Sequence, residues 1–323
     1  MPSVRFVIGL SLRAKNVPYP PEDMGYPLRE FLAERYYFLT SRTIDSQLLL
    51  RPDPEVNEIL GEWLVRAQQQ TGIELVVYVV MSNHWHAIVR APQQNIDRFV
   101  SLFKSQSSRQ VNELRDARRG TIYQRRYSCE PILDQESLLD RIIYILSNPV
   151  AAGLVDRAED WPGLSSLLQL IENQSVSFPV FDRTAWHAAG APEDRTPYME
   201  QAELRIVLPE FLAQMDPEER AAMIRERLEA VEAEHRQERE SRGASVLGGD
   251  KVLEEDPCAR PKRTNRSKRP LCHTSRIELW VEYREHWRHF RGSYRLAAQR
   301  YRAGDLTVEF PEGSFPPWIR KVA

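Results

Sequence analysis

The sequence lacks any apolar run of the roughly 20 residues that a membrane-spanning helix needs. Its longest apolar segment, residues 75–81, has the length of a single strand. Near the start, residues 6–10 are too short for the apolar core of a signal peptide, and no small-residue cleavage pattern follows them. We therefore expect a protein that does not cross a membrane, is not secreted and works in the cytoplasm.

Cysteine is scarce, and so are the spacings in which it usually acts. The three cysteines, Cys129, Cys258 and Cys272, form no C-x-x-C pair, which argues against a disulfide framework and a zinc ribbon. An H-E-x-x-H motif and a clustered set of carboxylate ligands are missing too. A zinc-dependent hydrolase is therefore a weak hypothesis for this chain.

The net charge is small, at −2 for 323 residues, but the charge is unevenly distributed. Residues 260–302 hold thirteen Arg or Lys against three acids, and residues 104–126 form a second basic stretch. Basic patches of this kind are typical of proteins that bind the phosphate backbone of nucleic acids.

The hydrophobic spacing between residues 35 and 170 predicts the order β-α-β-β-α-β-α. This order favours an α+β fold with a ferredoxin-like, mostly antiparallel sheet and packed helices, followed by a helical C-terminal extension. The expected elements are strands at 36–40, 73–81, 84–89 and 121–132, and helices at 55–70, 95–115 and 135–148, the last one stopped by Pro149.

Changes in composition suggest five parts. Residues 35–170 form the compact domain, and scattered prolines indicate a linker between it and a charged helix that opens with Asp216 and Pro217. The parts are an N-terminal extension at 1–34, the domain at 35–170, the linker at 171–215, the charged helix at 216–242 and a basic, aromatic C-terminal module at 243–323. The acidic helix could support a homodimer.

Two histidines, His84 and His86, stand two residues apart on a predicted strand. Alternate side chains of a strand share a face, so both imidazoles project the same way and Trp85 points to the other side. Two imidazoles placed in this way can hold one divalent metal ion. Without further context, an H-x-H pair more often consists of ordinary surface or half-buried histidines.

The context of the two histidines resembles a known family. The stretch from Met81 to Val89, M-S-N-H-W-H-A-I-V, is similar to the "M-P-N-H-hydrophobic-H" signature of single-tyrosine HUH transposases, with Ser82 in place of the usual proline. Residues 144–155, Y-I-L-S-N-P-V-A-A-G-L-V, resemble the family's second motif. The family includes bacterial insertion-sequence transposases and the REP-associated tyrosine transposases.

The resemblance implies the HUH nuclease fold and assigns roles to residues. Tyr144 would be the nucleophile, His84 and His86 the metal ligands, and Asn148, at i+4 from Tyr144, the third ligand. The metal would be Mg²⁺ or Mn²⁺, although two imidazoles would also accept zinc. The implied activity is metal-dependent cleavage and strand transfer of single-stranded DNA, with hairpin structure, through a covalent phosphotyrosine intermediate.

We expect the DNA backbone to be bound by two groups of cations. The aromatic residues of the C-terminal helix, from Trp280 to Tyr294, are better interpreted as a packed stripe than as a DNA contact. The DNA-binding candidates are Lys104, Arg109, Arg118, Arg119, Arg125 and Arg126 in the first group, and Arg284, Arg288 and Arg291 in the second.

A second hypothesis is a domesticated, non-catalytic DNA-binding or regulatory protein derived from such a transposase. The joint presence of His84, His86 and Tyr144 argues against it. The DNA target and the mobility of the element are not encoded in any pattern of the sequence.

Overall fold

The computed structural model describes residues 28–116, 120–124, 126–261 and 270–317. Its centre is a four-stranded antiparallel sheet in the order β2-β3-β1-β4. Helix α1 (Pro54–Thr71) joins β1 to β2 and helix α2 (Ile96–Leu114) joins β3 to β4, which is the ferredoxin-like arrangement. The predicted α+β fold is confirmed. The strands are β1 (Tyr36–Arg42), β2 (Glu74–Met81), β3 (His84–Arg90) and β4 (Ser128–Ile132).

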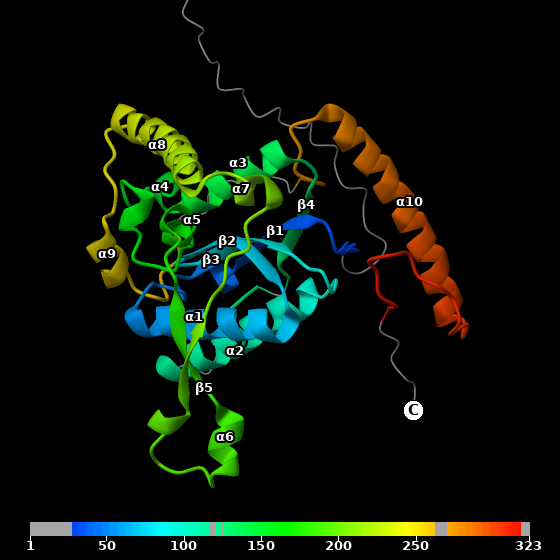
Figure 1. Cartoon of the computed structure of the whole chain (residues 1–323), viewed down its shortest axis with the longest axis horizontal. Coiled ribbons are helices and arrows are strands. Elements are labelled where there is room, and N and C mark those ends of the chain that lie inside the picture. Colours follow the sequence, from blue (N-terminus) through cyan, green and yellow to red (C-terminus); the bar gives the residue numbers. More distant parts are fainter. Residues whose placement is uncertain (1–27, 117–119, 125, 262–269, 318–323) are drawn as a thin grey trace, which may run out of the picture.

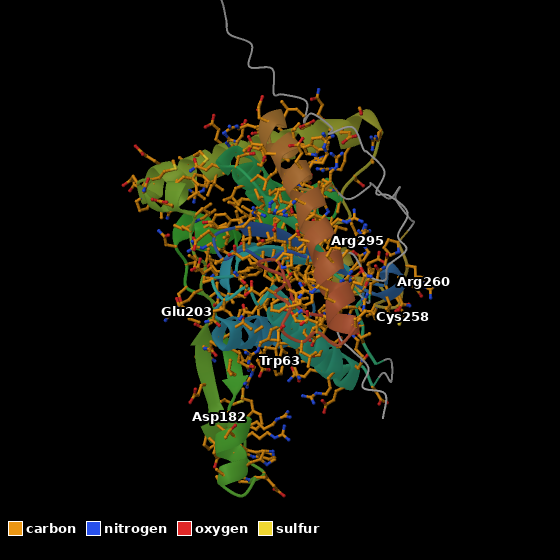
Figure 2. The ribbon with its side chains drawn as sticks, turned by 90° about the vertical axis from the view of Figure 1, so that its right-hand side faces the viewer. Trp63, Asp182, Glu203, Cys258, Arg260 and Arg295 are labelled. Carbon is orange, nitrogen blue, oxygen red and sulfur yellow. The ribbon has the colours of Figure 1, made fainter. Side chains whose placement is uncertain are left out.

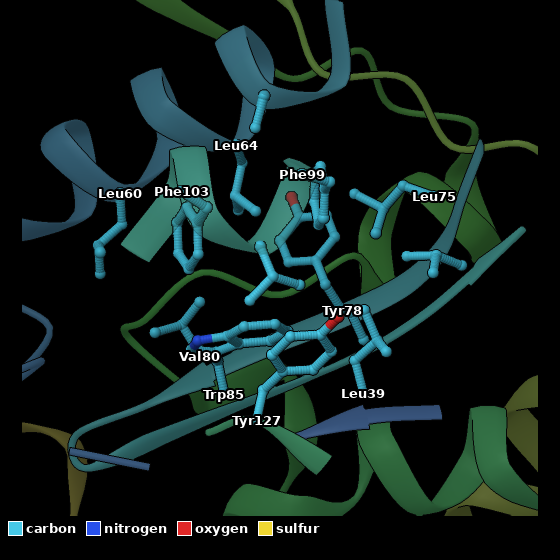
Figure 3. Packing of buried hydrophobic residues seen from close by; sticks show 14 of the residues in the cluster. Leu39, Leu60, Leu64, Leu75, Tyr78, Val80, Trp85, Phe99, Phe103 and Tyr127 are labelled. Atoms are coloured by element: carbon cyan, nitrogen blue, oxygen red, sulfur yellow. The ribbon is translucent and has the colours of Figure 1, made fainter. Parts of the chain in front are cut away.

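Helices α1 and α2 cover one face of the sheet (Figure 1). Helix α1 starts at Pro54, whose ring suits a first helical turn, and ends at Gly72, whose φ of 63° lies in the left-handed region. Leucines of α1 and phenylalanines of α2 pack on every second strand residue, among them Trp85 (Figure 3). Because the side chains of a strand alternate, the neighbours of Trp85 on β3 face the other way.

The opposite face is covered by α3 (Gln135–Leu146), α5 (Leu167–Glu172) and α8 (Pro217–Ser241). Phe38 and Ile88 of the sheet pack there in one buried cluster with Ile142 of α3 and Ile224 of α8. The sheet is therefore buried on both faces, and His84 and His86 belong to the face that α3 covers.

Both outer edges of the sheet are paired with other segments. Along β2, the N–H of Val80 donates to the carbonyl of Leu164, and the N–H of Val207 donates to the carbonyl of Leu75. Along β4, His273 exchanges two backbone hydrogen bonds with residues 131 and 133, so the C-terminal part of the chain closes this edge. Covered edges protect a sheet from pairing with other chains.

Helix α10 (Ile277–Arg302) lies lengthwise along the β4 side of the molecule, as Figure 2 shows with Arg295 labelled on it. Its aromatic residues Tyr283, Trp287 and Phe290 are buried and pack with Leu28 and Leu133. The interpretation of the aromatic stripe as packed is confirmed.

Residues 171–215, expected from their prolines to be a linker, contain regular secondary structure. Strands β5 (Ser177–Phe181) and β6 (Met199–Glu203) form an antiparallel pair that carries α6 (Arg183–Ala188) and projects from the body of the molecule (Figure 2). Phe178 packs on Gly61 so closely that a Cβ atom there would lie 2.1 Å from its ring. The prolines misled the prediction, because a two-stranded ribbon tolerates proline where a central strand does not. A short α7 (Glu210–Ala213) follows.

Two other boundaries differ from the prediction. Helix α3 ends at Leu146, and Pro149 lies in the first turn of a new short helix, α4 (Asn148–Ala151), a position that suits proline. Of the expected N-terminal extension, residues 28–34 are described, and buried Phe31 donates its N–H to the carbonyl of Gly313. The remaining elements are η1 (Ile44–Ser46), η2 (Ala158–Asp160), η3 (Thr196–Tyr198) and α9 (Gly249–Glu254). Among the described helices, none is both long and apolar enough for a membrane span.

Candidate active site

His84 and His86 lie on one face at the start of β3, with 4.8 Å between their ring centroids. Trp85 points to the opposite face, where its ring centroid lies 5.5 Å from that of Phe103. The shared face of the two histidines, predicted from strand geometry, is confirmed.

The ring of His84 is held between two asparagines. Its Nδ1 donates to Oδ1 of Asn83 at 2.6 Å, so in the neutral ring Nε2 carries a lone pair. This Nε2 atom faces Oδ1 of Asn148 at 3.3 Å. With Nδ1 as the donor, Nε2 and Oδ1 are both acceptors, a pair that would suit a cation shared between them.

The ring of His86 is oriented from the neighbouring strand. Its Nδ1 lies 2.7 Å from Oγ1 of Thr40, the residue directly opposite on β1. When Nδ1 carries the proton and donates a hydrogen bond to Oγ1 of Thr40, the lone pair of Nε2 is free to bind a ligand.

Both histidines are kept neutral. Burial, together with the charge of Arg42, lowers the pKa of His84 to about 4. Burial also lowers the pKa of His86 well below its ordinary value; the repulsion that a protonated His84 would exert and the charges of Arg42 and Arg141 act in the same direction. A neutral imidazole is the form that ligates metals.

Tyr144 lies on α3 above the two histidines. Its ring centroid is 5.7 Å from that of His86 and 5.9 Å from that of Phe38, and the guanidinium carbon of Arg141 lies 4.9 Å from it. The residue is 40% exposed, although it belongs to a helix whose apolar face is buried. Its phenol is thus accessible to a macromolecular substrate.

Two tyrosines at the end of the basic stretch of residues 104–126 are placed very differently. Tyr123 and Tyr127 are buried in the layer beneath α1 and α2, on the face opposite to the histidines. Burial raises the pKa of both phenols far above their ordinary range. A buried phenol that resists ionisation is a poor nucleophile.

The donor atoms around the histidines fit one divalent cation. Two imidazole nitrogens and the amide oxygen of Asn148 form a neutral, mixed N/O set of the kind that accepts Mn²⁺, Mg²⁺ or Zn²⁺. Within the described ranges, no group of three or more His, Cys, Asp or Glu could hold a metal. A cation bound here would therefore keep its full charge for an anionic ligand.

The candidate DNA-binding cations are spread over several elements. Lys104 donates to the carbonyl of Gln124 at 2.8 Å, and burial lowers its pKa to about 8; Arg109 is exposed on α2 beside Gln106. On α10, Arg288 is exposed, Arg284 stacks on Trp280 and Arg291 is partly exposed. Arg126 is partly exposed, and Arg118, Arg119 and Arg125 lie outside the described residues.

Four residues beside the site escaped the sequence analysis. Thr40 and Arg42 come from β1, which carries no motif, and only the sheet register places them opposite His86 and His84. Asn83 and Arg141 could have been found, since one precedes His84 and the other stands one helical turn before Tyr144.

The fold and the site together define a class of domain. It has a ferredoxin-like sheet, two histidines on a central strand and an exposed tyrosine above them. Residues 45–147 match the model of the family described as "Transposase IS200 like". This stretch of the chain is similar to that family, and it contains His84, His86 and Tyr144. Among curated proteins, no sequence matches the chain.

Solved structures also resemble the chain. A REP-associated tyrosine transposase bound to a REP hairpin is 21% identical, with a TM-score of 0.39, and the match covers 46% of this chain and 86% of that chain. A candidate transposase from Deinococcus radiodurans R1 is 24% identical, with a TM-score of 0.28, and the match covers 39% of this chain and 97% of that chain.

Proposed function

We propose that this protein cuts and rejoins single-stranded DNA through a covalent link to Tyr144, in a reaction that depends on a divalent metal. The observation that carries the proposal is the exposed ring of Tyr144, 5.7 Å from that of His86, on the same side as the facing atoms of His84 and Asn148. A packed core tyrosine would not be left open above two neutral histidines.

The reaction exchanges one phosphoester bond for another. The phenol oxygen of Tyr144 bonds to phosphorus, the bond from phosphorus to a deoxyribose oxygen breaks, and the phenol proton is lost while the leaving oxygen gains one. The phosphotyrosine bond conserves the energy of the broken ester. Attack by a deoxyribose hydroxyl on the phosphotyrosine rejoins the strand and releases the phenol.

His84, His86 and Asn148 would hold Mg²⁺ or Mn²⁺. When bound, the ion supplies a positive charge that polarises a nonbridging phosphate oxygen and helps to orient the scissile ester. The protein's part is to fix the ligand geometry, and Asn83 and Thr40 do so by holding the two imidazole rings from behind.

The partner we propose is single-stranded DNA with hairpin structure. The structural neighbour that is bound to a REP hairpin supports a DNA partner of this kind. Lys104, Arg109 and Arg126 and, on α10, Arg284, Arg288 and Arg291 are the described residues proposed to contact phosphates, and a homodimer and a cytoplasmic location remain part of the proposal.

Covalent capture of DNA tests this function. The full-length protein is incubated with Mn²⁺ and labelled single strands from the DNA that flanks its own coding sequence, and adducts are separated on a denaturing gel. We expect an adduct with the wild-type protein and none with Tyr144→Phe, which loses only the hydroxyl. Tyr198→Phe, a change at a described tyrosine outside the catalytic domain, is the matched control and should retain the adduct.

Two results would contradict the proposal. An adduct that persists in Tyr144→Phe would assign the nucleophile to another residue. A wild-type protein that binds these strands but never forms an adduct would favour the non-catalytic, regulatory alternative.

A further inference from the structure

Two arginines that neither sequence motif includes lie beside the candidate active site. Arg141 stands one helical turn before Tyr144 on α3, and its guanidinium carbon lies 4.9 Å from the centre of the tyrosine ring. Arg42 is directly opposite His84 in the register of β1 and β3, so both side chains project from the same face of the sheet.

Neither arginine forms an ion pair with any residue that the structure describes. Within the ranges that the structure describes, no carboxylate lies within ion-pair distance of Arg42 or Arg141. Asp140, the acid next in sequence to Arg141, forms its ion pair with Arg227 of α8 at 3.6 Å, while its charge also acts on Arg141 from beyond ion-pair distance. Arg42 is exposed, and Arg141 is partly buried.

The rest of the site adds no negative charge to offset them. The three candidate ligands are two imidazoles and an amide, none of which carries a negative charge. Arg141 stacks on the accessible ring of Tyr144, and Arg42 stands opposite His84 on the same face of the sheet. Two unpaired guanidinium groups around a neutral donor set are complementary to an anion, and a guanidinium binds the oxygens of a phosphodiester in a bidentate fashion.

We propose that Arg141 and Arg42 form a phosphate clamp: Arg141 holds the phosphate that Tyr144 attacks, and Arg42 holds the same strand where it passes His84. This inference rests on the proposed function and names the residues that place the substrate. The stacking of Arg141 on Tyr144 sets the nucleophile and the phosphate side by side, which favours attack by proximity.

Binding without cleavage gives the first test. The probe is a fluorescein-labelled oligothymidine in EDTA, and anisotropy reports its affinity for the full-length protein over a range of salt concentrations. Removing one arginine–phosphate interaction lowers the slope of log K against log salt by about 0.7 for a single strand. In the double variant Arg42→Gln/Arg141→Gln, we expect the slope to fall by about twice this amount. The control is Arg205→Gln, which changes an exposed arginine paired with Glu203 and should keep the wild-type slope.

The rate of adduct formation gives the second test. Arg141→Gln should slow it by a factor on the order of 10² to 10³, as expected when one group that stabilises the reacting anion is removed. Arg141→Lys keeps the positive charge but not the bidentate geometry of the guanidinium group, so this variant should recover part of the rate. Arg42→Gln should act mainly on DNA affinity. Far-UV circular dichroism of each variant verifies that the fold is intact.

The outcomes separate the clamp from the proposed function. If wild type forms the adduct while neither the salt slope nor the rate changes in the double variant, the clamp is refuted and the function stands. If wild type forms no adduct but the slope falls as expected, the cationic pair is a DNA-binding site and the cleavage proposal fails. If Arg205→Gln lowers the salt slope as much as a change at Arg42 or Arg141 does, the effect comes from net charge alone, and the clamp is refuted as well.

Discussion

Nε2 of His84 lies 3.3 Å from Oδ1 of Asn148, although 64 positions separate the two residues in the chain. The sheet register fixes His84, whereas Asn148 is the first residue of α4 and stands four positions after Tyr144. Ser147, between α3 and α4, remains in the right-handed helical region. The two successive helices thus bring Asn148 to His84 and Tyr144 to His86.

Removal of either imidazole should abolish adduct formation and weaken Mn²⁺ binding. His84→Ala and His86→Ala each leave too few protein ligands to fix the ion, whereas Asn148→Ala should have a milder effect because water can replace one amide oxygen. Electron paramagnetic resonance of free Mn²⁺ measures the affinity, and His289→Ala, an exposed site on α10, is the control. Undiminished cleavage in excess chelator would disprove the role of the metal.

Thr40 should tune metal affinity through the ring of His86. Thr40→Val preserves the branched shape on β1 but removes the hydroxyl that lies 2.7 Å from Nδ1. We expect Mn²⁺ affinity to fall about 10- to 100-fold, as for other groups that orient a metal-binding histidine. Thr40→Ser retains the hydroxyl and should restore most of it, so equal affinities in the valine and serine variants would show that the contact does not matter.

Asp134 should couple α3, the helix that carries Tyr144, to the C-terminal segment in a pH-dependent manner. Its carboxylate caps α3 at the N–H of Ser137 and accepts hydrogen bonds from Thr274 and Ser275. Burial raises the pKa of Asp134, but these hydrogen bonds outweigh it and hold the pKa below the usual 3.8. The carboxylate is stabilised in the folded state, so its contribution is complete above that value and is lost as the pH falls through the lower, folded-state pKa.

Asp134→Ala should therefore cost about 1 kcal/mol of unfolding free energy at neutral pH, the usual size of a lost helix cap. The difference from wild type should shrink on acidification below pH 3.8. Urea melts at pH 7 and at pH 3 measure both values. A difference that stays constant between the two would mean that the charge of Asp134 contributes nothing.

Variants at two neighbouring positions of α10 should distinguish a packing role from a DNA-binding role. Trp287→Ala empties part of the buried cluster with Phe290 and should cost about 3 kcal/mol or more. Arg288→Ala changes an exposed side chain, so stability should hold while the salt slope for single-stranded DNA falls by about 0.7. Thermal melts and anisotropy measure the two effects, and an unchanged slope would remove Arg288 from the DNA-binding surface.

Truncation after Gly249 should leave the catalytic domain folded if the sequence pattern alone is considered, because both motifs lie upstream of the cut. In the structure, this cut would remove His273 from the edge of β4 and expose the residues that α10 covers. We therefore expect the truncated chain to aggregate, because an open strand edge and an apolar patch are both liabilities. Light scattering of the purified fragment decides, and a soluble monomer would favour the simpler expectation from the sequence.

Much of the site could be predicted because its parts follow local periodicity. The alternation of β3 gave His84 and His86 one face, and helical spacing put Tyr144 on a polar strip, as the structure has them. The order of strands and helices likewise pointed to the sheet that is found. These features depend on residues two to four positions apart, where sequence and geometry are closely tied.

The missed features depend on contacts between distant segments. Nothing near Arg42 indicates that β1 runs beside β3, and nothing in residues 177–203 indicates that Phe178 will pack on Gly61. Prolines in that region suggest a linker, although an exposed ribbon accommodates them. Tertiary pairing decided these cases, and a local pattern does not encode it.

The hydrogen bond from Phe31 to Gly313 ties together the first and last parts of the described chain. During synthesis on the ribosome, strands β1 to β4 emerge long before the segment that covers the outer edge of β4 and the helix that covers Leu28 and Leu133. Until then the outer edge of β4 is unpaired, and contacts between such distant segments form slowly. The outer edge of β4 and the apolar residues under α10 are therefore covered only after residues 273–313 have been synthesised.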